Sequence, residues 1–490
     1  MTGLVDETLR DGPQSLWATR MKTEDMLGAT EWMERAGFRK LCVTSGAAFE
    51  TAVKFLRDDP WERLRRLRQG MPNAAIDVLI RSRNLFGWER YPDEVVALLF
   101  RCLKECGVQS VKVFDGLNCM RNIAAHFAIA HDVGLKAAGM LSFSISPAHT
   151  DEHYVAKAIE LLGYGVDSIV LADPAGILNA PRARSLLAAL KAAVAGRVPI
   201  EFISHDCMGL AYEAHREALL AGVDTVSTAA EALSHGESVP STLGILRLAQ
   251  ELGCPTGLDA EAVRRMDDYF DWVAWKEGHA VPAPVVFDQL RYEKFIGHQI
   301  PGGMMSNFRN QLREAGLLGR IEEVLEEASR VRAELGYPIM VTPFSQFVGV
   351  QATLNVLQGE RYKTVPEELL LYVQGHYGEP AAPIDANVLD RVLAGKSTGA
   401  VDCEALFGTR ILERFRREHG PFGSERELLL HLFYGRSHVE ALERDKKPLP
   451  ARACRKPLEV LVEALAREPG LKSLRLKKGP LSLGMRFSPC

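Results

Sequence analysis

Residues 1–250 of the chain alternate between short apolar runs and longer segments whose apolar residues have helical spacing. β-Branched residues are frequent in the short runs, which is typical of buried strands. The pattern predicts strands at Leu4–Thr8, Lys40–Thr44, Ala75–Ile80, Ser110–Phe114, Ala137–Phe143, Ser168–Leu171, Pro199–Ile203 and Asp224–Thr228. It predicts helices between them at Thr23–Ala36, Pro92–Cys106, Met120–Asp132, Asp151–Leu162, Pro181–Ala195 and Gly209–Ala221.

This order of elements predicts an α/β fold. Eight strands that each precede a helix, within about 250 residues, are the hallmark of a (β/α)8 TIM barrel. An open doubly wound sheet is the alternative, although such a sheet seldom needs eight consecutive units. We therefore expect residues 1–285 to form a TIM barrel.

The barrel predicts where the chemistry lies, because active sites of this fold occupy the carboxyl ends of the strands. The interior of such a barrel is otherwise filled by branched apolar side chains. Charged or imidazole side chains that follow the predicted strands are therefore candidates for the site, and they are Asp11, Arg81, Asp115, Asp173 and His205. Arg81 could alternatively pair with Asp115 and have only a structural role.

The alternation ends after residue 285. A polar, Gly-rich segment at 291–312 is followed by long helical patterns, such as Arg320–Leu335 and Pro366–Gln374. We expect residues 286–440 to form a mainly helical second domain, whose first loop folds back toward the barrel. Residues 441–490 form a small basic C-terminal segment. From Asp445 onward eleven Lys or Arg stand against four Asp or Glu. This segment is either a docking element for a partner or a solvated appendage.

Composition excludes several classes of protein. The 490 residues carry a net charge of −4, so no basic field points to nucleic acid. No apolar run approaches the ~18 residues of a membrane span, and the first residues lack the pattern of a secretory signal. The nine cysteines include no CxxC pair, so we expect reduced thiols and a cytoplasmic protein.

Several longer motifs follow one another between Asp6 and Leu393. They include DETLRDGPQSLWATRMKTEDML, NLFGWERYPDEVV, SPAHTDEHY, HQIPGGMMSNFRNQL and PEELLLYVQGHYGEPAAPID. In order and spacing they resemble the carboxyltransferase domain of biotin-dependent enzymes, a family with pyruvate carboxylase, the oxaloacetate decarboxylase alpha subunit and the transcarboxylase 5S subunit. The family fold is a barrel followed by a helical domain, which agrees with the elements predicted above.

The resemblance implies an enzyme that moves CO2 between carboxybiotin and a small keto acid, pyruvate or oxaloacetate, through an enolate beside a divalent metal. An enolate needs a Lewis acid or cationic donors where its negative charge develops. By resemblance, Asp11 matches a metal-binding aspartate and Gln14 a substrate-binding glutamine. Arg81 matches the arginine that holds the carboxylate of the keto acid, and Ser306 a hydroxyl that moves a proton between biotin and the enolate.

The chain departs from the family at several expected ligands. The family's carbamylated lysine falls on Ala172 in LADPAG, which has no amine to carbamylate. One histidine of the family's pair falls on Ile203, so only His205 remains. At the end of the second strand, the family's Glu, Trp and Gly are replaced by Cys42, Thr44 and Ser45.

A compensating pattern follows the eighth predicted strand, where LSHGESVP places His235 and Glu237. Together with Asp11 and His205, they have ligand types suited to a borderline divalent metal. The hypothesis is that these two residues substitute for the missing ligands. The alternative is that they are solvated loop residues.

We expect the carrier of carboxybiotin to be a separate protein, a biotin carrier protein or a biotin carboxylase subunit, because the MKM attachment signature is absent. We also expect a homo-oligomer. The leading hypothesis is a carboxyltransferase subunit. The alternatives are a pseudoenzyme that serves as a scaffold in a biotin-dependent complex, and a metal-dependent carbon–carbon lyase or synthase of the same barrel superfamily.

Overall fold

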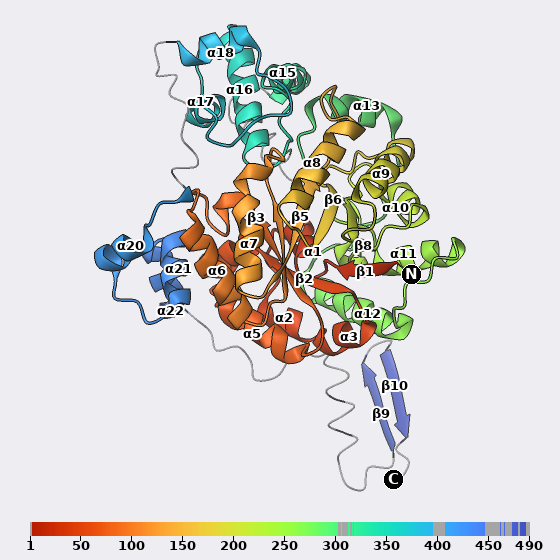
Figure 1. The fold of residues 1–490 in the computed structure, drawn as a ribbon. Coiled ribbons are helices and arrows are strands. Elements are labelled where there is room, and N and C mark those ends of the chain that lie inside the picture. Colours follow the sequence, from red (N-terminus) through yellow and green to blue (C-terminus); the bar gives the residue numbers. More distant parts are fainter. Residues whose placement is uncertain are drawn as a thin grey trace.

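The computed structural model describes residues 2–301, 318–394, 407–445, 473–478 and 481–486, and single positions at 305, 312, 313, 316, 461 and 465. Eight parallel strands form a closed barrel in the order of the sequence (Figure 1). They are β1 (Gly3–Asp6), β2 (Lys40–Ser45), β3 (Ile76–Arg81), β4 (Ser110–Phe114), β5 (Lys136–Ser142), β6 (Ser168–Asp173), β7 (Ile200–Ser204) and β8 (Thr225–Thr228). The predicted TIM barrel is confirmed, with strand boundaries within two residues of the predicted ones.

Most of the helices of the barrel units lie on its outer face, and the first lies at its rim (Figure 1). They are α1 (Asp11–Leu16), α2 (Thr23–Leu27), α3 (Thr30–Ala36), α4 (Gly46–Thr51), α5 (Pro60–Gly70), α6 (Asp93–Glu105), α7 (Ala124–Asp132), α8 (Asp151–Gly163), α9 (Ala180–Val194), α10 (Ala211–Leu220), α11 (Thr242–Glu251) and α12 (Ala260–Glu277). A π-helical segment continues α4 at Ala52–Leu56.

Two predicted helices differ from those in the structure. The single helix expected over Thr23–Ala36 is two short helices, because Gly28 is a weak helix former and the Thr30 hydroxyl donates to the Leu27 carbonyl at 2.8 Å. The helix expected from Met120 begins as a short 3-10 turn and becomes α-helical only at Ala124.

The strands present different residues to the two sides of the barrel. Val78, Val111 and Leu171 lie in the large apolar core shared with the surrounding helices. Inside the barrel, an apolar cluster includes Val170 and Ile203. The sequence led us to expect an apolar interior. The structure instead also places buried charged side chains there, Glu7, Asp77, Lys112 and Glu201. Each of them has a partner of opposite charge within the barrel, which offsets part of the cost of removing it from water.

A helical layer with its own apolar core follows the barrel. It comprises α15 (Ile321–Glu334), α16 (Phe344–Gln358), α17 (Glu367–Val373) and α18 (Ala386–Leu393). The preceding helix, α13 (Gln289–His298), packs on α15, but its buried Tyr292 and Phe295 belong to the core of the barrel. Val331, Phe347 and Leu369 belong to its core. The helices predicted at Arg320–Leu335 and Pro366–Gln374 are α15 and α17. Figure 1 shows this layer beside the end of the barrel where the strands terminate.

Three later helices pack on the barrel itself rather than on that layer. They are α20 (Leu412–His419), α21 (Glu425–Tyr434) and α22 (Arg436–Asp445). Leu429 and Phe433 join the large core of the barrel, and α21 lies against α6 (Figure 1). The division of the chain at residues 285 and 440 stays a prediction.

Beyond the end of α22, the basic C-terminal segment contains an antiparallel hairpin of β9 (Ser473–Lys478) and β10 (Leu481–Arg486). Arg475 and Lys477 are exposed on it. Among the helices that the structure describes, none is long and apolar enough to cross a membrane.

Candidate active site

A cavity of about 470 Å³ opens at the carboxyl ends of the strands. It brings together six residues that the sequence singled out, namely Asp11, Gln14, Arg81, Asp173, His205 and Glu237. These residues come from the first, third, sixth, seventh and eighth βα units, which meet because all strands of a parallel barrel end at the same rim. Ser306 lies outside the described residues.

Asp11 and His205 form an ion pair at this cavity. Nε2 of His205 lies 3.2 Å from Oδ1 of Asp11, and Nη1 of Arg10 donates to the same oxygen at 2.7 Å. On the other carboxylate oxygen, the hydroxyls of Ser238 and Ser15 donate at 3.2 and 3.5 Å. The sequence motif RDG pointed to Asp11. Arg10 stands beside Asp11 at the same strand end, but the sequence analysis assigned it no role in the site.

These contacts set the charges of the pair. Burial by itself raises the pKa of the Asp11 carboxyl, but the positive charges of His205 and Arg10 outweigh burial and hold that pKa below its usual range. Burial by itself lowers the pKa of His205, but the Asp11 carboxylate outweighs it and raises that pKa. The site therefore stabilises a carboxylate beside an imidazolium.

Arg81 ends β3 and presents its guanidinium to the cavity. Nη2 donates to the Gly87 carbonyl at 2.8 Å, and the guanidinium lies 4.7 Å from the centre of the Trp88 ring. The sequence allowed an ion pair between Arg81 and Asp115. Instead, Asp115 accepts hydrogen bonds from Ser82 and from its own loop. No carboxylate in the described part of the chain pairs with Arg81, so its charge is available to an anionic ligand.

Gln14 and Trp88 complete this side of the cavity. Gln14 lies on α1, and its Oε1 accepts a hydrogen bond from Ser45 at 2.7 Å. The indole Nε1 of Trp88 donates to Oε1 of Glu50 at 2.9 Å. Neither Trp88 nor Glu50 was singled out from the sequence. An aromatic residue in the loop after a strand that ends in arginine was the available signal.

The cavity lacks two ligands of the metal site that the family resemblance implies. Ala172 and Ile203 line it, and both belong to the apolar cluster inside the barrel. Among the residues that the structure describes, no three His, Cys, Asp or Glu side chains are arranged to hold a metal ion. The described side chains at this cavity therefore do not fit a site with four protein ligands.

The structure does not bring His235 to the other proposed ligands. Its ring is buried, with Nδ1 3.4 Å from Asp206 and Nε2 3.3 Å from Glu231. Burial by itself lowers the pKa of His235, but the two carboxylates raise it to about 9. A protonated imidazole has no lone pair for a metal. Glu237 does line the cavity, where it accepts a long contact of 3.6 Å from the Cys207 thiol.

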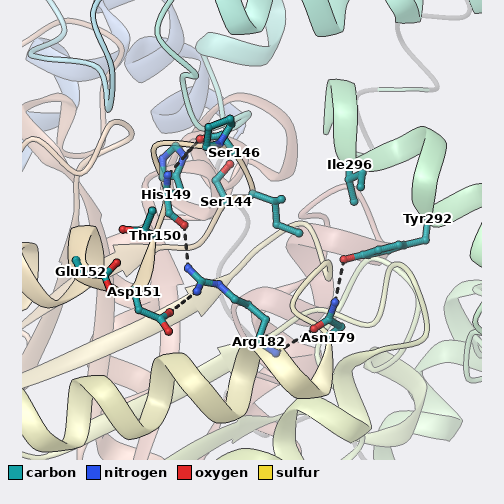
Figure 2. A pocket seen from close by; sticks show the side chains of 12 residues that line it. Ser144, Ser146, His149, Thr150, Asp151, Glu152, Asn179, Arg182, Tyr292 and Ile296 are labelled. Carbon is teal, nitrogen blue, oxygen red and sulfur yellow. Dashed lines mark hydrogen bonds and ion pairs between the residues drawn. The ribbon is translucent and has the colours of Figure 1, made fainter.

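A second cavity, of about 620 Å³, lies between the loops after β5 and β6 and helix α13 (Figure 2). It contains most of the motif SPAHTDEHY. Figure 2 shows that its polar side chains contact one another: Ser146 bonds Nδ1 of His149 at 2.7 Å, and Arg182 contacts Asp151 and the His149 carbonyl. Thr150 caps α8. These local contacts indicate that the motif has a structural role, because they hold the loop before α8 and the first turn of that helix.

Comparisons with known proteins agree with this architecture. A family model described as "Conserved carboxylase domain" matches residues 296–465. A pyruvate carboxylase subunit of Methanocaldococcus jannaschii is 37% identical over 479 residues, which cover 96% of this chain and 83% of that protein. The methylmalonyl-CoA carboxyltransferase 5S subunit of Propionibacterium freudenreichii is 37% identical over 387 residues, or 79% of this chain and 75% of that protein.

The fold is similar to that of solved structures. The carboxyl transferase domain of Rhizobium etli pyruvate carboxylase with pyruvate superimposes with a TM-score of 0.81 and 28% sequence identity, over 90% of this chain and 76% of that one. The similarity therefore extends over the barrel and into the helices that follow it.

Proposed function

Because the chain belongs to the carboxyltransferase family of biotin-dependent enzymes, we propose that it moves CO2 between carboxybiotin on a separate carrier and a small keto acid, pyruvate or oxaloacetate. One observation carries the proposal: Asp11, Gln14, Arg81 and His205 line a single cavity at the carboxyl ends of the barrel strands. Retention of these four residues favours an enzyme over a scaffold that has lost its site.

The cavity supplies groups that match a keto acid. The Arg81 guanidinium has no carboxylate partner among the described residues and presents the planar donor pattern that binds a carboxylate through two hydrogen bonds. Gln14 donates from its amide toward the keto oxygen, because Ser45 already occupies its Oε1. His205, charged beside Asp11, adds a second cationic donor near the same cavity.

The reaction exchanges a carboxyl group for a proton. Carboxybiotin loses CO2 from its ring nitrogen, and the methyl group of pyruvate loses a proton to that nitrogen. The resulting enolate carbon attacks CO2 and forms oxaloacetate. The reverse sequence decarboxylates oxaloacetate. Arg81 and His205 stabilise the negative charge of the enolate, and Ser306, by resemblance, relays the proton. The described residues do not form a metal site of the expected kind, and no step here passes through a metal.

The partners follow from the same reaction. A biotin carrier protein or a biotin carboxylase subunit presents carboxybiotin. Independently of the reaction, we expect the chain to act as a homo-oligomer. We place it in the cytoplasm, in keeping with the free cysteines among the described residues, such as Cys42, Cys102 and Cys207.

The test is the consumption of oxaloacetate by the purified chain with and without free biotin. We expect biotin-dependent turnover that Arg81→Gln abolishes and that Arg182→Gln retains, since Arg182 lies at the second cavity. Absence of turnover in the unaltered chain would favour the scaffold. Cleavage of a keto acid without biotin would favour the lyase.

A further inference from the structure

A line of alternating charges continues from the active-site cavity into the barrel. Glu7, in the turn after β1, binds two cations through its two carboxylate oxygens. On Oε2 it accepts from Arg10, at 2.9 Å from Nε and 2.6 Å from Nη2, and on Oε1 it accepts from Lys112 at 2.7 Å. The Lys112 amine also lies 3.4 Å from Asp77. Because Arg10 contacts Asp11 as well, the line runs from Asp11 through Arg10, Glu7 and Lys112 to Asp77.

Each of these side chains is shielded from water. Glu7 and Asp77 are fully buried, and Lys112 and Arg10 are only 1% and 5% exposed. A buried charge without a partner is strongly unfavourable, so each member of the line depends on its neighbours. The signs alternate along the line. Removal of Glu7, at its centre, therefore leaves two buried cations facing each other.

Glu7 fixes the direction of the Arg10 guanidinium. Two of the nitrogens of Arg10 contact Glu7, which leaves Nη1 directed at Oδ1 of Asp11. Arg10 thus divides its charge between two carboxylates. Without the negative charge of Glu7, Asp11 alone balances Arg10, and the electrostatic attraction between Asp11 and His205 is reduced.

We propose that Glu7 and Lys112 are positioning residues for the active site: Lys112 holds Glu7, and Glu7 holds the arginine that orients Asp11 toward His205. Neither residue lines the cavity, so both act through Arg10. Lys112 lies on β4 and Glu7 follows β1, and the contact therefore links the site to a strand across the barrel. The inference rests on the proposed function for its effect on rate, but not for its effect on the structure of the site.

The barrel contains a matched control. Glu201, on β7, forms an ion pair with Lys40 and accepts from the Ser168 hydroxyl at 2.6 Å. Its side chain is 5% exposed and is likewise an acidic group inside the barrel. It forms no hydrogen bond or ion pair with Arg10, Glu7 or Lys112 among the described contacts, and its charge acts on Lys112 only through space, more weakly than that of Glu7. Glu201→Gln is therefore the control for the loss of an ion pair that only stabilises the interior of the barrel.

The first measurement is the rate of biotin-dependent oxaloacetate decarboxylation by Glu7→Gln and Glu201→Gln, together with their thermal unfolding. We expect Glu7→Gln to lower kcat by about tenfold or more, as for a lost charge-assisted hydrogen bond, with KM changed less than about threefold because Arg81 and Gln14 are untouched. Glu201→Gln lowers the unfolding temperature and leaves kcat within about twofold. At Lys112, we expect Lys112→Met to lower kcat. Lys112→Arg, which keeps the positive charge, should retain most of the kcat of the unaltered protein.

The second measurement needs no turnover. In protein with isotope-labelled histidine, the imidazole signal of His205, assigned with His205→Gln, shifts in Glu7→Gln and stays in place in Glu201→Gln. Equal losses of kcat in Glu7→Gln and Glu201→Gln, or an unmoved His205 signal in a folded Glu7→Gln protein, overturn the inference. If the unaltered chain has no turnover, the proposed function fails, and the His205 signal alone decides whether Glu7 positions the site.

Discussion

Nε2 of His205 lies 3.2 Å from Oδ1 of Asp11, although 194 positions separate the two residues in the sequence. The contact joins the first and seventh βα units at the rim of the barrel. It pairs a carboxylate whose pKa is held low with an imidazole whose pKa is raised. An ion pair at the mouth of a barrel, beside an arginine without a carboxylate partner, suits a substrate that becomes more negative during the reaction.

The first prediction concerns the charge of Asp11. Asp11→Asn keeps the size of the side chain but leaves Arg10 and His205 without their shared carboxylate. We expect the free energy of unfolding to fall by about 3 kcal/mol, as for the loss of one partner of a buried pair, and kcat to fall by about a hundredfold. Urea unfolding and the decarboxylation assay measure the two effects. Ser15→Ala, which removes only a 3.5 Å contact to Asp11, serves as the control and keeps most of both quantities.

The second prediction concerns Trp88, which is 54% exposed beside the Arg81 guanidinium. Trp88→Ala removes a cation–π contact that is worth about 0.5–2 kcal/mol, so we expect KM for oxaloacetate to rise by about 2- to 30-fold with a smaller change in kcat. Trp88→Phe retains part of the contact, so its KM should lie between that of the unaltered protein and that of Trp88→Ala. Trp275→Ala, at a residue that is 78% exposed and does not line the cavity, provides the control. An unchanged KM in Trp88→Ala would show that the ring does not support Arg81.

The third prediction concerns metal. His235 is paired with Asp206 and Glu231 rather than directed at Asp11 and His205. We therefore expect His235→Ala to leave the metal content of the purified protein unchanged, measured by atomic emission. We also expect dialysis against EDTA to leave the decarboxylation rate within about twofold, since no three described acidic, Cys or His side chains form a metal site. A loss of metal and rate in His235→Ala would restore this histidine as a ligand.

The fourth prediction concerns the pH dependence of stability. Asp267 on α12 is 4% exposed, and burial, with the nearby carboxylates of Glu231, Asp271 and Asp268, raises its pKa to about 7. Between pH 4 and 7 the folded state therefore binds more protons than the unfolded state, and this carboxyl makes stability fall as pH rises through that range. Above pH 7 the full cost of the buried charge is present.

Asp267→Asn removes the cost of burying a charge. It keeps a side-chain oxygen that can accept the hydrogen bond from the backbone N–H of Glu231, which donates to Oδ1 of Asp267 at 3.0 Å. We expect the variant to exceed the unaltered protein in free energy of unfolding by about 2–4 kcal/mol at pH 8 and by only about 1–1.5 kcal/mol at pH 5. Urea unfolding at the two pH values measures the difference. Asp268→Asn, at the exposed neighbouring position, makes the same change in net charge and should show a much smaller dependence, because it leaves Asp267 buried and removes only one of the nearby carboxylates.

Much of the fold was predictable because its signals are local. The apolar alternation located Ser110–Phe114 with the bounds of β4 and placed the other strands within two residues. The break between α2 and α3 was missed because it depends on Gly28 and on one hydrogen bond from the Thr30 hydroxyl to the Leu27 carbonyl, within otherwise helical spacing. Asp11, Arg81 and His205 were found because each follows a strand, and strand ends share one rim in a parallel barrel.

The sequence by itself determined the order of the strands, the family and the residue types at the rim of the barrel. Periodicity and motif spacing are properties of neighbouring positions, so they can be read without coordinates. The tertiary structure decided which buried charges meet: Glu7 with Lys112 across the barrel, and His235 with Asp206 instead of Asp11. The choice of partner depends on where distant segments converge and on the need to pair every charge removed from water.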